Sequence, residues 1–138
     1  MRYLFVAYCA ITLSCQTRDP ATATSDTSGF EAFYQQFHTD STFQLERIIF
    51  PLSGLPANAD SLTLSKKDYK WTKDNWLLHR PFDSTLTGFE HKLTELGEGM
   101  ILETFLQKDT RMAMERRFAI VDGNWHLIYY AGMNPVGQ

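Results

Sequence analysis

The chain has 138 residues, of which 43% are hydrophobic and 14% aromatic, and its formal net charge is −3. This size and composition fit a single globular domain built around one core. The acidic balance argues against nucleic acid and against an anionic membrane surface as partners, because both attract cationic proteins. The sequence contains no internal repeat and no block of like charges.

The first 14 residues have the layout of a secretory signal. Arg2 supplies an early positive charge, residues 4–13 form an almost unbroken apolar run, and the small residue Ser14 ends it. The run is too short to span a bilayer, which takes about 20 residues. Cys15 follows directly, so the segment resembles the lipobox of bacterial lipoproteins, although Thr12 stands where that pattern favours leucine. The resemblance implies that the Cys15 thiol receives a diacylglycerol; an ordinary signal peptide with an incidental cysteine is the alternative.

Residues 15–28 contain no large apolar side chain. Burial therefore cannot offset the entropy cost of ordering them, and we interpret them as a flexible tether after the lipidated cysteine. By the same resemblance, Gln16 in place of an aspartate after the cysteine favours the outer membrane, with the periplasmic or surface face left open. The expected location is the bacterial cell envelope, with contact to the membrane through the N-terminal lipid.

The domain is expected at residues 29–134, with 135–138 as a tail, and it opens with a helix. Ser28 and Glu31 have the spacing of a capping box. Aromatic residues then recur at helical spacing on one face, namely Phe30, Phe33, Tyr34 and Phe37. This stripe predicts a helix face that packs on the core and that can also roof a pocket.

A second short helix is expected over residues 43–48, with Asp40 placed to cap it. Residues 48–52 are typical of a buried edge strand with Pro51 near its end, since proline lacks a ladder donor. Leu62 and Leu64 alternate with polar residues, which predicts a short strand, and residues 76–79 are a further strand candidate.

After Pro81 the sequence predicts long strands. Three segments have strong β character, residues 85–93, 100–108 and 111–121. Asp122-Gly123 is a preferred two-residue hairpin turn, from which residues 124–131 return. The second half is therefore expected to form an antiparallel meander. Helices followed by such a meander indicate an α+β domain.

Two stretches resemble known proteins. Residues 116–127, which read Arg-Arg-Phe-Ala-Ile-Val-Asp-Gly-Asn-Trp-His-Leu, resemble the last hairpin of the nuclear-transport-factor-like superfamily. A second pattern resembles the opening of a family of bacterial lipoproteins with that fold, a domain family of unknown function: Phe33-Tyr34-x-x-Phe37-x-x-Asp40-Ser41-x-Phe43-Gln44-x-x-Arg47-Ile48-x-Phe50-Pro51-Leu52. The resemblance covers about residues 30–133 and implies N-terminal helices packed on a long, curved antiparallel sheet, a cystatin-like α+β cone with a pocket. It implies no activity, because a shared fold does not define a reaction.

Arg116 is the main candidate for ligand binding. Alternation along its strand places it on one face with four apolar residues, Met112, Met114, Phe118 and Ile120. A guanidinium is costly to bury there without an anion, and Glu103 on the preceding strand is the expected internal partner. Two interpretations stay open, a structural ion pair at the pocket rim and an arginine that binds an anionic ligand. Tyr130 completes the set of candidate ligand-binding residues.

No metal and no cofactor is expected. The four histidines, His38, His79, His91 and His126, lack metal-ligand spacing with a carboxylate or a cysteine. A phosphate-binding glycine loop and a serine–histidine nucleophile motif are also missing from the sequence. The superfamily resemblance implies that its isomerases and dehydratases use a carboxylate or a carboxylate–histidine pair, for which His79 with Asp83 and His91 with Glu103 are the options here. No catalytic residue is assigned, and a non-enzyme is favoured over an enzyme.

The predicted function is that of a lipid-anchored binding or assembly module for an unidentified ligand or partner. The expected partners are a small acidic ligand or an envelope protein, with a homodimer as a further option and no nucleic acid. One alternative is a small-molecule enzyme that uses the cone pocket for acid/base chemistry. The other is glycan or peptide binding by Lys66–Trp76, where basic and aromatic residues alternate. That stretch also fits a solvated loop whose tryptophans turn into the core.

Overall fold

The computed structural model of the chain describes residues 27, 29–83, 85 and 88–136. The predicted signal, the lipidation at Cys15 and nearly all of the predicted tether lie outside the described residues. Within them, no helix is long and apolar enough to cross a membrane. The elements in chain order are α1 (Phe30–Thr39), α2 (Ser41–Glu46), β1 (Ile48–Leu55), α3 (Ser61–Lys66), β2 (Lys70–Trp71), β3 (Phe89–Gly97), β4 (Met100–Gln107), β5 (Met112–Val121) and β6 (Asn124–Pro135).

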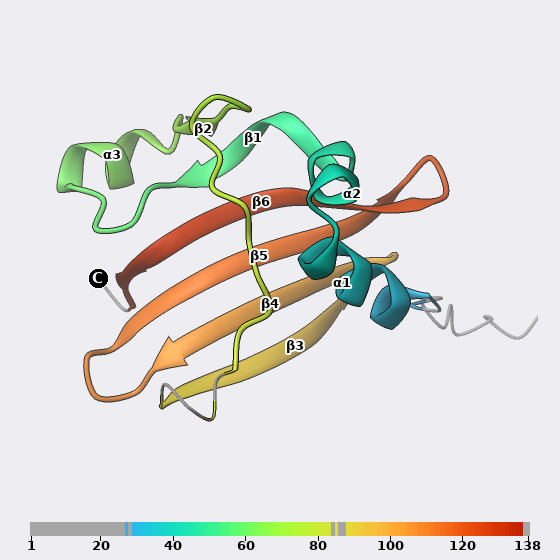
Figure 1. Cartoon of the computed structure of the whole chain (residues 1–138). Coiled ribbons are helices and arrows are strands. Elements are labelled where there is room, and N and C mark those ends of the chain that lie inside the picture. The colour runs from blue at the N-terminus through green and yellow to red at the C-terminus, as the bar shows by residue number, and fades with distance from the viewer. Residues whose placement is uncertain (1–26, 28, 84, 86–87, 137–138) are drawn as a thin grey trace, which may run out of the picture.

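The strands form one sheet in the order β2-β1-β6-β5-β4-β3. Strands β3 to β6 are the predicted antiparallel meander, and positive φ angles at Asp122 and Gly123 make the turn between the last two. β1 pairs antiparallel with β2 but parallel with β6. The fold is therefore α+β, as predicted, but the sheet is mixed rather than wholly antiparallel. Figure 1 shows the long strands curving, with α1 and α2 on one face.

The predicted aromatic stripe forms the core between α1 and the sheet. Phe30, Phe33 and Phe37 are all buried, and their ring centroids lie 5.5 to 5.7 Å from that of Phe118 on β5. Trp125 on β6 packs against the same rings. The helix start differs from the expected capping box, because Gly29 is the N-cap and provides no side-chain cap; Ser28 lies outside the described residues.

The connection from α2 to β1 follows the sequence signals in part. Asp40 caps α2 as predicted, with Oδ1 accepting hydrogen bonds from the amides of Thr42 and Phe43 at 3.0 Å. β1 is not an edge strand, since β2 pairs on its outer side. Pro51 lies inside β1, where the register with β6 shifts between Ile48 and Ser53. At this irregularity the sheet does not require a backbone N–H donor from Pro51, which has none.

Two of the expected strands are absent from the described part of the chain. Leu62 and Leu64 lie in α3, because Asp60 caps that helix by accepting from the amide of Thr63 at 2.7 Å. Residues 76–79 are part of an irregular segment, residues 72–83, which we call the strap. The strap crosses the face of the sheet that carries α1, and it leads towards β3, which starts at Phe89 rather than at residue 85 (Figure 1).

Candidate functional site

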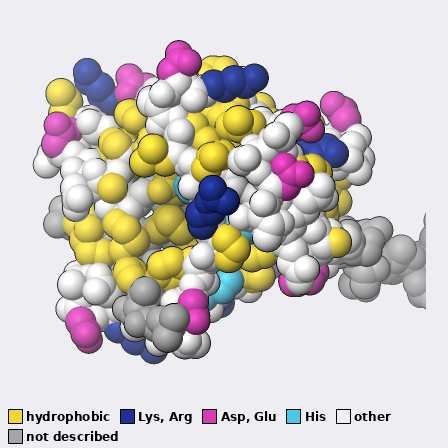
Figure 2. All heavy atoms as spheres, in the orientation of Figure 1, with side chains coloured by type: hydrophobic (Ala, Val, Ile, Leu, Met, Phe, Trp, Pro, Cys, Tyr) yellow, Lys and Arg dark blue, Asp and Glu magenta, His cyan; other side chains and the backbone are white. Residues whose placement is uncertain are grey.

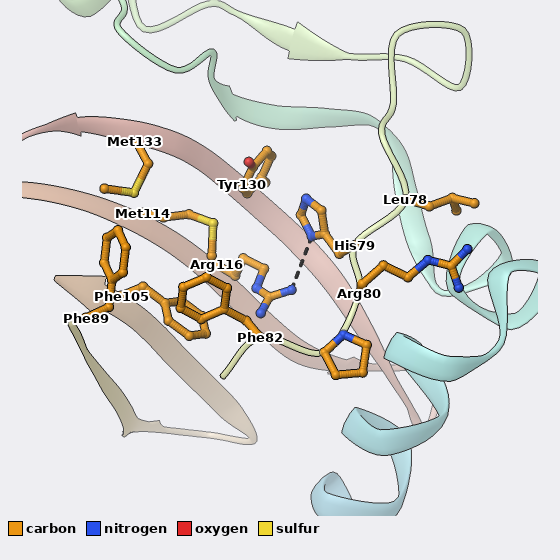
Figure 3. Close-up of a pocket in the computed structure, with 11 residues that line it drawn as sticks. Leu78, His79, Arg80, Phe82, Phe89, Phe105, Met114, Arg116, Tyr130 and Met133 are labelled. Carbon is orange, nitrogen blue, oxygen red and sulfur yellow. Dashed lines mark hydrogen bonds between the residues drawn. The ribbon is translucent and has the colours of Figure 1, made fainter. Parts of the chain in front are cut away.

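A cavity of about 400 Å³ lies between the strap and the sheet. Its walls are mostly apolar and come from Phe82 of the strap and from the sheet residues Phe89, Phe105, Met114 and Met133. The polar residues of its lining are His79, Arg80, Arg116 and Tyr130. The side chain of Arg80 points away from the other three (Figure 3). On this face, hydrophobic side chains surround a hollow that has basic atoms beside it (Figure 2). Such a largely apolar cavity with a few polar groups has the character of a small-molecule site.

One of the residues that line the cavity, Arg116, belongs to a buried ion pair. Glu103 of β4 and Arg116 of β5 are direct partners in the register of the two strands, and both point into the protein, with 0% and 2% exposure. Arg116 Nε is 2.6 Å from Glu103 Oε2, although the two atoms are not aligned as a hydrogen bond. The internal partner expected for Arg116 is therefore present. The two opposite charges compensate each other where water cannot.

The second oxygen of Glu103 is shared by two further side chains. Glu103 Oε1 accepts from the Tyr34 hydroxyl at 2.5 Å and lies 2.8 Å from His91 Nε2. Burial, reinforced by the Glu103 charge, raises the pKa of Tyr34 well above its usual range, so its hydroxyl stays protonated and acts as the donor. The carboxylate of Glu103 thus connects α1, β3 and β5.

The guanidinium fixes the proton positions of two histidines. Arg116 Nη1 lies 2.8 Å from His38 Nε2 and 3.2 Å from His79 Nδ1. Because a guanidinium can only donate, both ring nitrogens are acceptors. His38 then carries its proton on Nδ1, which donates to the carbonyl of Tyr34 at 2.7 Å, and His79 carries its proton on Nε2. Burial and the Arg116 charge lower the pKa of both rings, that of His79 to about 3, so both are neutral near pH 7.

The remaining nitrogen, Arg116 Nη2, has no hydrogen-bond partner among the described residues. Arg116 lines the cavity, and its guanidinium end lies between His79 and the ring of Phe82 (Figure 3). The rings of Phe105 and Phe118 lie 5.6 and 5.8 Å from the guanidinium carbon and stabilise the buried cation. Two N–H groups of a buried cation are therefore left for a molecule that enters the cavity.

The strap is held in place by Gln44 of α2, a residue to which the sequence analysis gave no role. Gln44 is 1% exposed, and its amide makes two hydrogen bonds to the main chain of His79, both 2.8 Å long. It also donates to the carbonyl of Phe37 at 2.6 Å and accepts from Trp76 Nε1 at 3.3 Å. The only sequence signal was the place of Gln44 within the lipoprotein-like opening pattern.

The other candidate residues are placed as follows. Tyr130 lines the cavity beside Arg116, its partner in the β5–β6 register, and burial raises the pKa of its hydroxyl. Of the two candidate carboxylate–histidine pairs, His91 and Glu103 are in contact. In the other, His79 contacts Arg116, and Asp83 Oδ1 accepts from the amide and hydroxyl of Thr85. Across the described ranges, no three His, Cys, Asp or Glu side chains are grouped so that they could hold a metal ion.

Ile120 and the tryptophans of Lys66–Trp76 are placed differently with respect to solvent. Ile120, which alternation placed on the apolar side with Arg116, is 39% exposed near the end of β5. In the stretch Lys66–Trp76, both tryptophans turn inward: Trp71 Nε1 donates to the carbonyl of Tyr130 at 3.0 Å, and Trp76 is buried. Their indole N–H groups are therefore used inside the protein.

No family model matches the chain, and no curated protein matches it. Among solved structures, the chain is similar to a cystatin-like protein from Bacteroides caccae ATCC 43185. The two are 21% identical over 78% of this chain and 80% of that chain, with a TM-score of 0.40.

Proposed function

We propose that this chain is a lipid-anchored protein of the bacterial cell envelope whose domain binds a small acidic ligand in the cavity under the strap. The anchor is supported by the order of the apolar run, Ser14 and Cys15 in the sequence, and the outer membrane by Gln16. The proposed fold family is the nuclear-transport-factor-like cone of the lipoprotein domain that the sequence resembles. The packing of α1 on the long curved meander supports that assignment.

One observation carries the ligand proposal: Arg116 Nη2 has no partner among the described residues at the cavity, while Nε lies 2.6 Å from Glu103 Oε2 and Nη1 donates to His38 and His79. A carboxylate, sulfonate or phosphate oxygen is the natural acceptor for two N–H groups on one nitrogen. The remainder of the ligand is apolar, because the cavity walls offer mainly aromatic and methionine side chains.

The charges around the cavity also favour an acid. Both charged residues in the lining, Arg80 and Arg116, are cationic. Glu103 does not line the cavity, and Arg80 makes no ion pair within the described part of the chain. Glu103 is buried and does not line the cavity, so it is poorly placed as the general base of an enzyme, which must reach the substrate.

The test is direct binding of two dyes with the same aromatic body, anilinonaphthalene sulfonate and the uncharged phenylnaphthylamine. We expect both to bind, with the sulfonate about tenfold tighter, because a hydrogen bond to a charged group contributes about 1.5–3 kcal/mol. Met114→Trp fills the cavity and is expected to weaken both dyes. Leu106→Trp is the matched control, since Leu106 lies on the opposite face of β4 from the cavity residue Phe105. Dye binding that Met114→Trp leaves unchanged would contradict the proposed site.

A further inference from the structure

We infer that anion binding at Arg116 is linked to proton uptake at His91, so that the cavity holds its ligand more tightly at acidic pH. The inference rests on the proposed function and concerns the regulation of that same site. It follows from a chain of contacts in which one buried carboxylate serves two cationic side chains.

Glu103 is the link between the two sites. Its Oε2 is 2.6 Å from Arg116 Nε, and its Oε1 is 2.8 Å from His91 Nε2. The side chains of Glu103 and Arg116 are 0% and 2% exposed, whereas that of His91 is 28% exposed. His91 is therefore the residue among these three that solvent reaches, at the edge strand β3.

The sign of the effect follows from the charges. With His91 neutral, the negative charge of Glu103 compensates Arg116, and an anion at Nη2 adds an uncompensated negative charge to a poorly solvated site. With His91 protonated, the three groups carry one positive charge in total, and the anion neutralises it. By linkage, protonation of His91 tightens anion binding, and a bound anion raises the proton affinity of His91 by the same factor.

The side chains that face His91 come from α1 and β4. From α1, the Tyr34 ring faces His91 with the ring centroids 6.5 Å apart, and the Tyr34 hydroxyl keeps its proton. Also on α1, the charge of His91 contributes to lowering the pKa of His38. From β4, Glu103 contacts it, and Phe105 stacks on it at 4.3 Å. His38 and His79 cannot take up a proton without losing their hydrogen bonds from Arg116 Nη1.

Other charged groups lie close by but serve different partners. On β3 itself, Glu90 pairs with Lys108 at 2.9 Å, and alternation places Glu90 and Lys92 on the opposite face from His91. On the strap, Arg80 lines the cavity, and Asp83 accepts hydrogen bonds from Thr85.

The experiment measures the dissociation constants of the two dyes at about pH 5.5 and about pH 8, which bracket histidine titration. The sulfonate stays ionised at both, and the neutral dye reports any general change in the cavity. For the wild-type protein we expect the sulfonate to bind about tenfold tighter at the lower pH, within the usual range of coupling between sites, and the neutral dye to change little.

His91→Gln is the decisive variant, because its amide can still donate to Glu103 but cannot become charged. We expect it to keep the neutral-pH affinity for the sulfonate and to lose the gain at acidic pH. His126→Gln is the matched control, since His126 lies on β6 with its Nδ1 against the carbonyl of Asn124. In case His91→Gln fails to fold, the wild-type His91 ring is titrated by NMR, and its midpoint is expected to rise when the sulfonate binds.

The outcomes separate this inference from the proposed function. A pH response that persists in His91→Gln, an equal response of the neutral dye, or a His91 midpoint that the sulfonate leaves unmoved overturns the linkage while cavity binding stands. If neither dye binds in the cavity at either pH, the proposed function fails, and the linkage fails with it.

Discussion

Gln44 holds His79 by both main-chain polar groups of that residue. Gln44 Nε2 donates to the carbonyl of His79 and Gln44 Oε1 accepts from its amide, each at 2.8 Å. A side-chain amide thus takes the place of a neighbouring strand for a segment that has none. Since His79 in turn accepts from Arg116, one residue of α2 sets the position of the strap over the cavity.

Gln44→Ala is therefore expected to destabilise the protein and to loosen the strap in particular. The change leaves the amide and the carbonyl of His79 without partners, which costs about 1–3 kcal/mol for each buried group. Chemical denaturation gives the free energy of unfolding, and hydrogen exchange at residues 76–80 should accelerate more than exchange in β5. Gln36→Ala, at an exposed position of α1, is the control and should change little. Unaltered exchange in the strap would show that Gln44 does not hold it.

The parts of the fold that were predictable depend on local patterns. Alternation and the Asp-Gly turn located the strands from Met100 onward, and helical spacing identified the buried face of α1. The pairing of Arg116 with Glu103 also followed, because strands joined by a short turn bring such residues into register. These signals lie within a few residues of each other in the chain.

The parts that were missed depend on contacts between distant segments or on competing local signals. The parallel pairing of β1 with β6 joins residues about 75 positions apart, which no local period records. At Leu62 and Leu64, alternation suggested a strand, but Asp60 caps this segment and stabilises it as a helix. The strap has no ladder and no period, so the role of Gln44 and the cavity beneath His79 became visible only in the structure.

Phe37→Ala is expected to cost about 3–5 kcal/mol of unfolding free energy, because the side chain is 0% exposed and stacks edge-on to Phe118. That loss is a large share of the stability of a single domain. Thermal or urea denaturation measures it. Leu77→Ala is the comparison, since Leu77 is 79% exposed on the strap and should change stability by no more than about 0.5 kcal/mol. A Phe37→Ala protein as stable as Leu77→Ala would contradict the packing of α1 on the sheet.

Cys15→Ser is expected to abolish metabolic labelling with a lipid precursor, because formation of the thioether needs the thiol. The protein should then stay uncleaved or leave the membrane fraction. Cys9→Ser is the control, since Cys9 lies inside the apolar run and follows the bulky Tyr8, and its labelling should be normal. Lipid label on the Cys15→Ser protein would contradict the proposed anchor.

Stability should fall as the medium becomes acidic, owing to the buried neutral histidines. The pKa of His79 is about 3 in the folded protein against an ordinary 6.5, so the unfolded chain binds a proton that the folded one does not. The contribution is fully present above about pH 6.5 and is lost as the pH falls from there towards 3. Urea unfolding across this range should show a shallower pH slope in His79→Asn than in wild type, and an unchanged slope in His126→Asn. Equal slopes in all three proteins would contradict the neutral state of His79.

Arg116 and Glu103 should stabilise the empty protein only as a pair. Arg116→Met leaves the Glu103 carboxylate buried with only Tyr34 and His91 as partners, and breaking a buried pair from one side costs about 3–5 kcal/mol. Adding Glu103→Gln removes the stranded charge, so the double variant should recover part of the loss. Unfolding free energies of the wild type, the two single variants and the double variant give the coupling.

The adjacent pair on β5 is the matched control for this cycle. Arg117 and Glu115 are 2.6 Å apart, but their side chains are 44% and 32% exposed, so Arg117→Met should cost no more than about 1 kcal/mol. If Arg116→Met proves as mild as Arg117→Met, the guanidinium is not needed to compensate Glu103 in the empty protein. In that case the affinity of the sulfonate dye for Arg116→Met decides whether Arg116 acts on the ligand alone: a loss of about tenfold or more would assign it there.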